Sequence, residues 1–181
     1  MTIIEIERPA PTPTLAPAKQ RILDTADVLF YDEGIRAVGV DRLISASSVT
    51  KATFYKHYGS KDRLISDYVS LRHRQAVVEI AELVERFSES EAVLRSLQET
   101  ICASISSNDF RGCPFINAAA EFSDPTHPVR RSVVAHREWL VGAYEQLLRG
   151  LGHPMAGEAA DDLVLARDGA MTGGYAGEPI A

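Results

Sequence analysis

Residues 47–61 combine positive charges with hydroxyl, phenol and imidazole groups on one short stretch of chain. The cations Lys51, Lys56 and Lys61 could contact phosphates, and the threonine, tyrosine and histidine side chains between them carry donors and acceptors suited to base edges. Residues 40–46, which have apolar spacing, come shortly before, and two serines follow them. A short helix, a tight turn and a second helix form a helix-turn-helix, whose second helix enters the major groove. The pattern therefore predicts an interface with duplex DNA.

The helical register of this second helix decides which side chains face outward. Phe54 and Tyr58 are four residues apart, so they share one face and can point into a core. The side chains left with polar ends outside are Lys51, Thr53, Tyr55, Lys56 and His57. Aromatic residues at helical spacing usually belong to a core, so the alternative is that Tyr55 and His57 pack inside. We favour the outward orientation because Phe54 and Tyr58 already supply the core side.

The charge distribution divides the chain into two parts. The 181 residues carry a formal net charge of −6, but residues 17–74 have a net charge of +3 and residues 75–181 a net charge of −8. A mildly basic N-terminal segment followed by an acidic C-terminal segment is typical of a protein that binds a polyanion through its basic part. The 45% hydrophobic and 24% charged content is ordinary for a globular protein with ample length for a core.

Three segments of the sequence agree in residue type, order and spacing with a known family. They are residues 34–44, 49–58 and 60–64. Together they resemble the DNA-binding domain of the TetR/AcrR family of bacterial transcriptional regulators. The resemblance extends without a gap from about residue 18 to residue 71, and its specificity is much greater than that of a bare helix-turn-helix pattern.

The resemblance implies an all-α fold, a domain organisation and a mode of action. Residues 18–62 are expected to form an N-terminal three-helix helix-turn-helix DNA-binding domain, and residues 63–181 a C-terminal helical bundle that binds an effector and dimerises. A homodimer formed through the C-terminal helices would bind half-sites roughly 34–36 Å apart, or a multiple of that distance. The expected function is that of a sequence-specific repressor released from a palindromic operator by a small apolar ligand. The alternatives are a DNA-binding protein without an effector pocket and a helical enzyme.

The resemblance also assigns DNA contacts to individual residues. The expected contacts are Thr50, Lys51, Thr53, Tyr55, Lys56, His57 and Lys61. Lys51 and Thr53 are expected near base edges. Tyr55 and His57 are expected at phosphate or sugar, Thr50 and Lys61 at phosphates, and Lys56 is given no specific type of contact. For Lys61 the alternative is a solvated surface lysine. At position 48 the family usually has glycine, so Ser48 is expected to adopt the turn conformation at some energetic cost.

Apolar spacing and breaker residues predict the remaining helices. The expected helices span residues 18–32, 61–87, 91–107 and 128–151, with further helices beginning near residues 40, 50, 114 and 157. The first should bury Ile22, Leu23, Ala26, Leu29 and Phe30 and stop at Gly34 in a left-handed conformation. The last should dissolve at Gly173. Family members usually continue into one more helix, so its apparent absence predicts a weaker or rearranged dimer interface.

An effector pocket is expected in the helical bundle because residues 110–122 resemble a segment of TetR-like ligand-binding bodies. Such pockets are mostly apolar and lie among the fourth to eighth helices. The candidate lining residues are Phe87, Cys113, Phe115, Asn117, Trp139 and Tyr144. For each of them the alternative is ordinary core packing.

Catalytic patterns are not evident in the sequence. His136 begins no H-E-x-x-H zinc motif, and there is no glycine-rich phosphate loop and no G-x-S-x-G. Asp124 and His127 could form a metal site with Asp161 and Asp162 only by accident of folding. Cys113 has no evident base, so a structural cysteine is the better interpretation. We therefore predict no catalytic residue, no metal site and no cofactor.

The termini and the cysteine content indicate where the protein works. No apolar run approaches the roughly 20 residues that span a bilayer, and the acidic N-terminus is unlike a secretory signal. Two cysteines cannot form a disulfide framework, so a reducing cytoplasm is expected, with no membrane partner. Residues 1–17 contain four prolines and are expected to form a disordered arm. The alternative is a minor-groove arm that uses Arg8 and Lys19.

Overall fold

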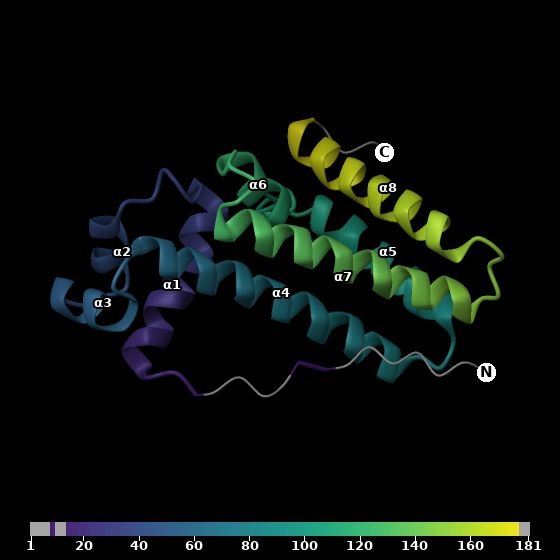
Figure 1. Cartoon of the computed structure of the whole chain (residues 1–181), viewed down its shortest axis with the longest axis horizontal. Helices are drawn as coiled ribbons and strands as arrows, with labels where there is room; N and C mark the ends of the chain where they lie inside the picture. The colour runs from purple at the N-terminus through teal and green to yellow at the C-terminus, as the bar shows by residue number, and fades with distance from the viewer. Residues whose placement is uncertain (1–7, 10–13, 178–181) are drawn as a thin grey trace. The chain divides into compact units, whose positions relative to one another are not determined.

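The computed structural model describes residues 8–9 and 14–177, and within them it contains eight α-helices and no strand (Figure 1). The helices are α1 (Pro17–Glu33), α2 (Val40–Ala46), α3 (Lys51–Tyr58), α4 (Lys61–Arg86), α5 (Ser90–Ile105), α6 (Pro114–Glu121), α7 (Pro128–Gly150) and α8 (Ala156–Ala176). The all-α expectation is confirmed. None of the helices in this described part is long and apolar enough to cross a membrane. The arm predicted over residues 1–17 lies mostly outside the described residues, and Pro17 is the first residue of α1.

The described chain divides into two compact units built from discontinuous segments. The head unit comprises residues 14–72 and 114–133, and the body unit comprises residues 8–9, 73–113 and 134–177. This division differs from the predicted boundary at residue 62, because the first part of α4 and all of α6 belong to the head unit.

Contacts made by α4 and α6 explain why they belong to the head unit. The ring of Tyr68 on α4 packs edge-on against Phe30 of α1, with 5.4 Å between centroids. At the end of α6, the carboxylate of Glu121 accepts hydrogen bonds from the backbone that follows α1. Both contacts join residues far apart in the sequence, so spacing alone does not reveal them.

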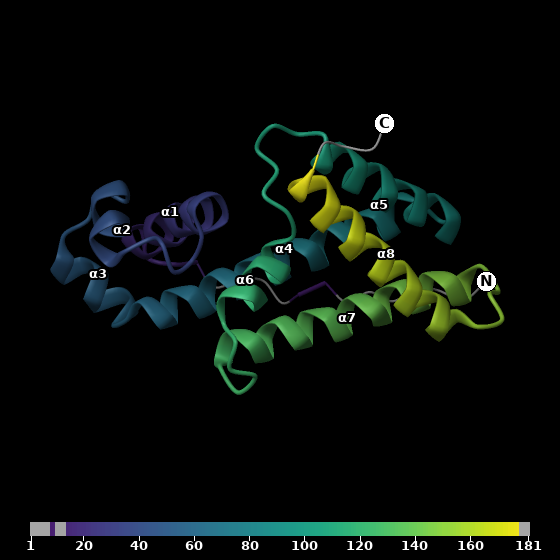
Figure 2. The same ribbon diagram turned by 90° about the horizontal axis from the view of Figure 1, so that it is seen from above.

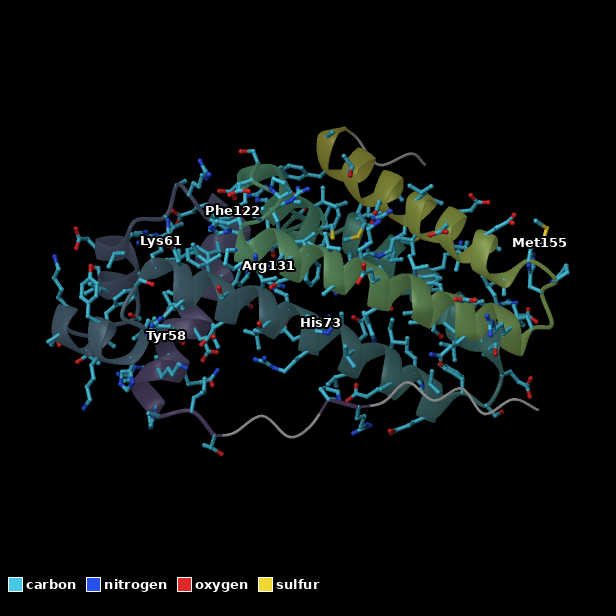
Figure 3. The ribbon with its side chains drawn as sticks, in the orientation of Figure 1. Tyr58, Lys61, His73, Phe122, Arg131 and Met155 are labelled. Atoms are coloured by element: carbon cyan, nitrogen blue, oxygen red, sulfur yellow. The ribbon has the colours of Figure 1, made fainter. Side chains whose placement is uncertain are left out.

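The core of the head unit confirms the predicted helix faces. All five residues predicted on the inner stripe of α1 are buried. Phe54 is fully buried and Tyr58 is 2% exposed, so the inward face of α3 is as expected. Figure 3 shows Tyr58 beside α1, where its hydroxyl donates a hydrogen bond of 3.1 Å to the carbonyl of Lys19. Burial raises the pKa of Tyr58, which keeps this donor protonated.

The chain leaves α1 through a backbone conformation that differs from the predicted cap. Gly34 has φ 94° and ψ 148°, so its φ is positive as expected, but its ψ is extended. The prediction of a left-handed helical cap at Gly34 is therefore correct for φ and wrong for ψ. The extended ψ directs the next residues toward Glu121, whose carboxylate holds the amides of Ile35 and Arg36.

The turn between α2 and α3 has the strain expected from its sequence. Ser48 has φ 52°, and it is the one non-glycine residue with positive φ among the described residues. Ser47 is buried, and its hydroxyl donates a hydrogen bond of 2.6 Å to the carbonyl of Leu43. The turn is thus anchored at its first serine and strained at its second.

Replacing Ser48 with glycine is expected to raise the free energy of unfolding by about 0.5–1 kcal/mol. Glycine removes the steric cost of the positive φ, and the extra chain entropy of the unfolded state offsets only part of the gain. Chemical denaturation of Ser48→Gly measures this change. Ser45→Gly, in the exposed part of α2, is the control and should be destabilising. An unchanged or lower stability for Ser48→Gly would contradict the assignment of strain.

The body unit is held by a core contributed by four helices. Its buried residues are Ile80 from α4, Val93 and Leu97 from α5, Leu140, Ala143, Tyr144, Leu147 and Leu148 from α7, and Ala160 and Val164 from α8, with Ala156 at the start of α8. Leu147 and Val93 are fully buried. These helices provide the framework on which the pocket described below is built.

Helix α8 continues to Ala176, so the prediction that it dissolves at Gly173 is wrong. The glycines are tolerated because α8 packs closely against α5 at this end. A Cβ on Gly174 would collide with the side chain of Ile105. Two helices can approach this closely only where one lacks a side chain, so Gly174 favours the contact that extends the helix.

Candidate functional site

Helix α3 is positioned by a hydrogen-bonded cap at each end. The hydroxyl of Thr50 accepts from the backbone N–H of Thr53 at 3.1 Å, which makes Thr50 the N-cap. The same hydroxyl lies 2.8 Å from the hydroxyl of Thr53. At the other end Gly59 adopts φ 71°, and Ser60 caps α4 by accepting from the N–H of Arg63 at 3.3 Å. These caps fix the short α3 between two turns.

The outer face of α3 presents most of the predicted contact residues to solvent. Lys51 and Lys56 are exposed and Tyr55 is 44% exposed, while Thr53 and His57 are half-buried. The ring of Tyr55 packs edge-on against the buried ring of Phe54, at 5.4 Å between centroids. Packing against the buried Phe54 therefore fixes the orientation of the Tyr55 ring.

Lys61 is held more closely than a solvated surface lysine. Its ammonium lies 3.4 Å from the backbone carbonyl of Arg36 and 5.8 Å from the centroid of the Phe30 ring. Burial lowers the pKa of Lys61, and the charges of Glu121 and Asp62 oppose that shift. In Figure 3, Lys61 lies near the junction of the helix-turn-helix with α4. Its charge is thus fixed at the N-terminus of α4.

Sequence reasoning missed Glu121, which holds the loop before α2. Its two carboxylate oxygens accept hydrogen bonds from the N–H of Ile35 at 2.8 Å and of Arg36 at 2.6 Å. The guanidinium of Arg36 lies over the ring of Phe122, 5.4 Å from its centroid. The end of α6 therefore clamps the helix-turn-helix. Glu121 is 85 residues from Arg36 in sequence, and no local pattern marks it.

The body unit contains a pocket of about 700 Å³. It is lined by Glu91, Leu94, Arg95, Gln98, Ile101, Cys102 and Ile105 of α5, by Tyr144 of α7, and by Leu163, Ala166, Arg167 and Ala170 of α8. Of the six residues predicted to line an effector pocket, Tyr144 is the one that lines this pocket. The volume lies within the range of small-molecule sites.

The other predicted pocket residues lie elsewhere. Phe87 and Trp139 are half-buried and pack against the core of the body unit. Cys113 is buried, and its Sγ lies 3.9 Å from Nη1 of Arg167. Phe115 and Asn117 are on α6, which belongs to the head unit. These five residues do not line this pocket, and their contact with an effector stays a prediction.

Trp139 is surrounded by two histidines, the half-buried His73 and the buried His136. Nδ1 of His73 and Nδ1 of His136 are 3.1 Å apart, and the rings of both histidines contact the indole. Burial lowers the pKa of His136 to about 3, with His73 and Arg167 acting in the same direction. The pair therefore remains neutral at physiological pH. Among residues 8–9 and 14–177, no three His, Cys, Asp or Glu side chains are placed to hold a metal ion.

Comparisons with known proteins agree on one family. Residues 22–68 match the family model described as bacterial regulatory proteins, tetR family. The regulator LmrA of Bacillus subtilis, described as an HTH-type transcriptional regulator, is 29% identical over 138 residues, which cover 75% of this chain and 73% of LmrA.

Solved structures extend the similarity to most of the chain. A TetR-family transcriptional regulator from Streptomyces coelicolor is 39% identical with a TM-score of 0.85, over 90% of this chain and 86% of that one. A second structure, from Streptomyces avermitilis, has the same fold at 23% identity and a TM-score of 0.78, over 89% of this chain and 87% of that one. The identity and the coverage of the first structure confirm the resemblance inferred from the helix-turn-helix. The chain belongs to the TetR family and is a DNA-binding transcriptional regulator.

Proposed function

We propose that the outer face of α3 reads operator bases and that the protein is a repressor released by a small ligand. The DNA contact is proposed because one face of α3 is buried in the core and the opposite face is exposed. Phe54 and Tyr58 anchor α3 in the core, and exposed Lys51, Lys56 and Tyr55 face outward. Such a helix can enter a major groove without exposing its core.

The local geometry supports different roles along α3. Lys51 and Thr53 near the N-terminus of α3 are proposed to reach base edges, as recognition helices commonly do from their first turns. Tyr55, Lys56 and His57 are proposed to contact the phosphate and sugar backbone. Thr50, at the N-cap, and Lys61, at the start of α4, would bind phosphates beside free helix N–H groups.

We propose that the regulator acts as a homodimer through its C-terminal helices. Leu165 and Tyr175 on α8 are 60% and 54% exposed, which supports a partner surface on this helix. Two copies would place two α3 helices on a near-palindromic operator. The effector would bind in the body unit and release DNA only if it has different affinities for the bound and free conformations. We place the protein in the cytoplasm with its DNA partner and assign it no catalytic step.

Selection of duplexes from a random DNA pool tests this proposal. The purified protein should enrich a two-fold symmetric motif, because the two heads of a dimer bind identical half-sites. A reporter promoter that carries the selected motif then tests the direction of regulation, and expression of the protein should lower reporter output. A rise in output would establish an activator, and an asymmetric single half-site would contradict the dimer.

Lys61→Met is expected to weaken DNA binding by a similar factor for all sequences. It should also lower the salt slope of log K by about one, because one phosphate contact is removed. Methionine is unbranched and apolar, so it can lie over the Phe30 ring where the ammonium lies now, and the head unit should keep its stability. Fluorescence anisotropy at several salt concentrations measures both quantities. Arg95→Met, on α5 of the body unit, is the control; an equal slope for wild type and Lys61→Met would rule out the phosphate contact.

A further inference from the structure

The pocket of the body unit has mostly apolar walls. Figure 2 shows α5 and α8 alongside each other, and the two helices are in contact. Their facing side chains that line the pocket include Leu94, Ile101, Ile105, Leu163 and Ala166. A drug-sized apolar body would therefore replace water against most of this surface.

One guanidinium interrupts this apolar wall. The side chain of Arg167 is 17% exposed, and its Nη1 contacts Asp168 Oδ1 at 3.0 Å and Cys113 Sγ at 3.9 Å. Nε and Nη2 make no hydrogen bond with any residue in the described ranges. A guanidinium has five N–H donors and stays charged. Arg167 therefore has donors available to a ligand in the pocket.

The carboxylate beside Arg167 does not cancel the local positive charge. Asp168 also pairs with Arg137, so one carboxylate faces two guanidinium groups. Glu79 interacts electrostatically with Arg167, but it is exposed to solvent and does not line the pocket. At the pocket's α5 wall, Glu91 and Arg95 form their own ion pair at 2.6 Å. Among the charged residues that line the pocket, Arg167 is therefore the one with no partner in the lining, and its burial reduces screening by water.

Tyr144 supplies a second donor to the pocket. It is 6% exposed and lines the pocket, and its hydroxyl makes no hydrogen bond with the described residues. Burial raises the pKa of Tyr144, although the charge of Arg167 opposes the shift, so the hydroxyl remains a neutral donor. A wholly apolar ligand would bury the donors of Arg167 and Tyr144 without accepting a hydrogen bond from either. Burying unpaired donors makes the free energy of binding less favourable.

We infer that the pocket binds an amphipathic monoanion, an apolar body whose single acidic group pairs with Arg167 and Tyr144. This inference rests on the proposed function, in which the body unit binds the effector, and it replaces the expected purely apolar ligand by an organic acid. The acid group would accept hydrogen bonds from the remaining guanidinium N–H groups and from the phenol. The apolar body would lie between α5 and α8.

A matched pair of fluorescent probes tests the inference on the full-length protein. The anionic probe is 8-anilinonaphthalene-1-sulfonate, and the neutral probe is N-phenyl-1-naphthylamine, which has the same rings without the sulfonate. Arg167→Gln should lower the affinity for the anionic probe roughly tenfold or more, which corresponds to loss of a hydrogen bond between charged groups. The affinity for the neutral probe should change by less than about twofold, because its apolar contacts remain.

Two further variants localise the effect. Arg137→Gln removes the other partner of Asp168 but no donor that lines the pocket, so it should lower the affinity for the anionic probe by much less than Arg167→Gln does. Ala166→Trp fills the pocket and should abolish binding of both probes. If Arg167→Gln fails to fold by circular dichroism, Arg167→Lys replaces it and should retain a preference for the anionic probe. Equal losses in Arg137→Gln and Arg167→Gln, or unchanged anion binding in Arg167→Gln, would overturn the inference.

Operator binding by the same samples separates this inference from the proposed function. If the anionic probe binds through Arg167 but leaves DNA affinity unchanged, the ligand class is supported and release by such ligands is contradicted. If DNA is released by neutral compounds while Arg167→Gln has no effect on any probe, the regulatory mechanism stands and the monoanion is wrong.

Discussion

Phe54→Ala is expected to lower the free energy of unfolding by about 3–5 kcal/mol. Phe54 is fully buried at the centre of the head unit, and its ring contacts the rings of Tyr55 and Tyr58 at 5.4 and 6.1 Å. Truncation loses the transfer free energy of the ring and leaves a cavity that the short α3 cannot collapse to fill. DNA affinity should fall with stability, because the orientation of α3 depends on this side chain.

Chemical denaturation and operator binding together measure the effect of Phe54→Ala. Tyr55→Ala is the matched control, since it removes a neighbouring aromatic ring that is 44% exposed. It should change stability by about 1 kcal/mol or less but still weaken DNA binding. The packing account would be wrong if Phe54→Ala cost less than about 1 kcal/mol, or if the two variants were equally destabilised.

Glu121→Ala is expected to destabilise the head unit by about 2 kcal/mol and to lower DNA affinity roughly tenfold. Its carboxylate accepts hydrogen bonds from two backbone amides, and hydrogen bonds to charged groups are worth about 1.5–3 kcal/mol when shielded from water. The bond to Arg36 is exposed, which reduces the total. Loss of the clamp frees the loop before α2, so the helix-turn-helix would have to become ordered on binding DNA.

Hydrogen exchange of individual amides measures the clamp directly. In Glu121→Ala the amides of Ile35 and Arg36 should exchange faster, while amides in the core of the body unit should be unchanged. Glu138→Ala is the control, because Glu138 is exposed on α7 and forms no ion pair with the described residues. Unchanged exchange at Ile35 and Arg36 would show that Glu121 does not hold the loop.

Features set by neighbouring residues could be predicted from the sequence. The stripe on α1 and the inward face of α3 follow from residue spacing, which a single segment determines. The strain at Ser48 could also be predicted, because the turn requires a positive φ whichever residue occupies it.

Features set by contacts between distant segments could not be predicted. The place of α6 in the head unit depends on the hydrogen bonds of Glu121 with Ile35 and Arg36. The pocket depends on how closely α5 and α8 approach, which Gly174 and Ile105 decide. Arg167 is one of five charged residues in the sequence of α8, and its contact with Cys113, 54 residues away, depends on the fold.

Operator selection with an α3 variant tests the central claim most directly. The double substitution Lys51→Ala and Thr53→Ala removes both proposed base contacts and leaves the anchors Phe54 and Tyr58 in place. The variant should enrich a motif with altered or relaxed preference at symmetric positions, at unchanged half-site spacing, because base contacts specify sequence and dimer geometry fixes spacing. Each lost base contact should cost about 1–3 kcal/mol of discrimination. Enrichment of the wild-type motif with unchanged affinity would contradict base reading by α3.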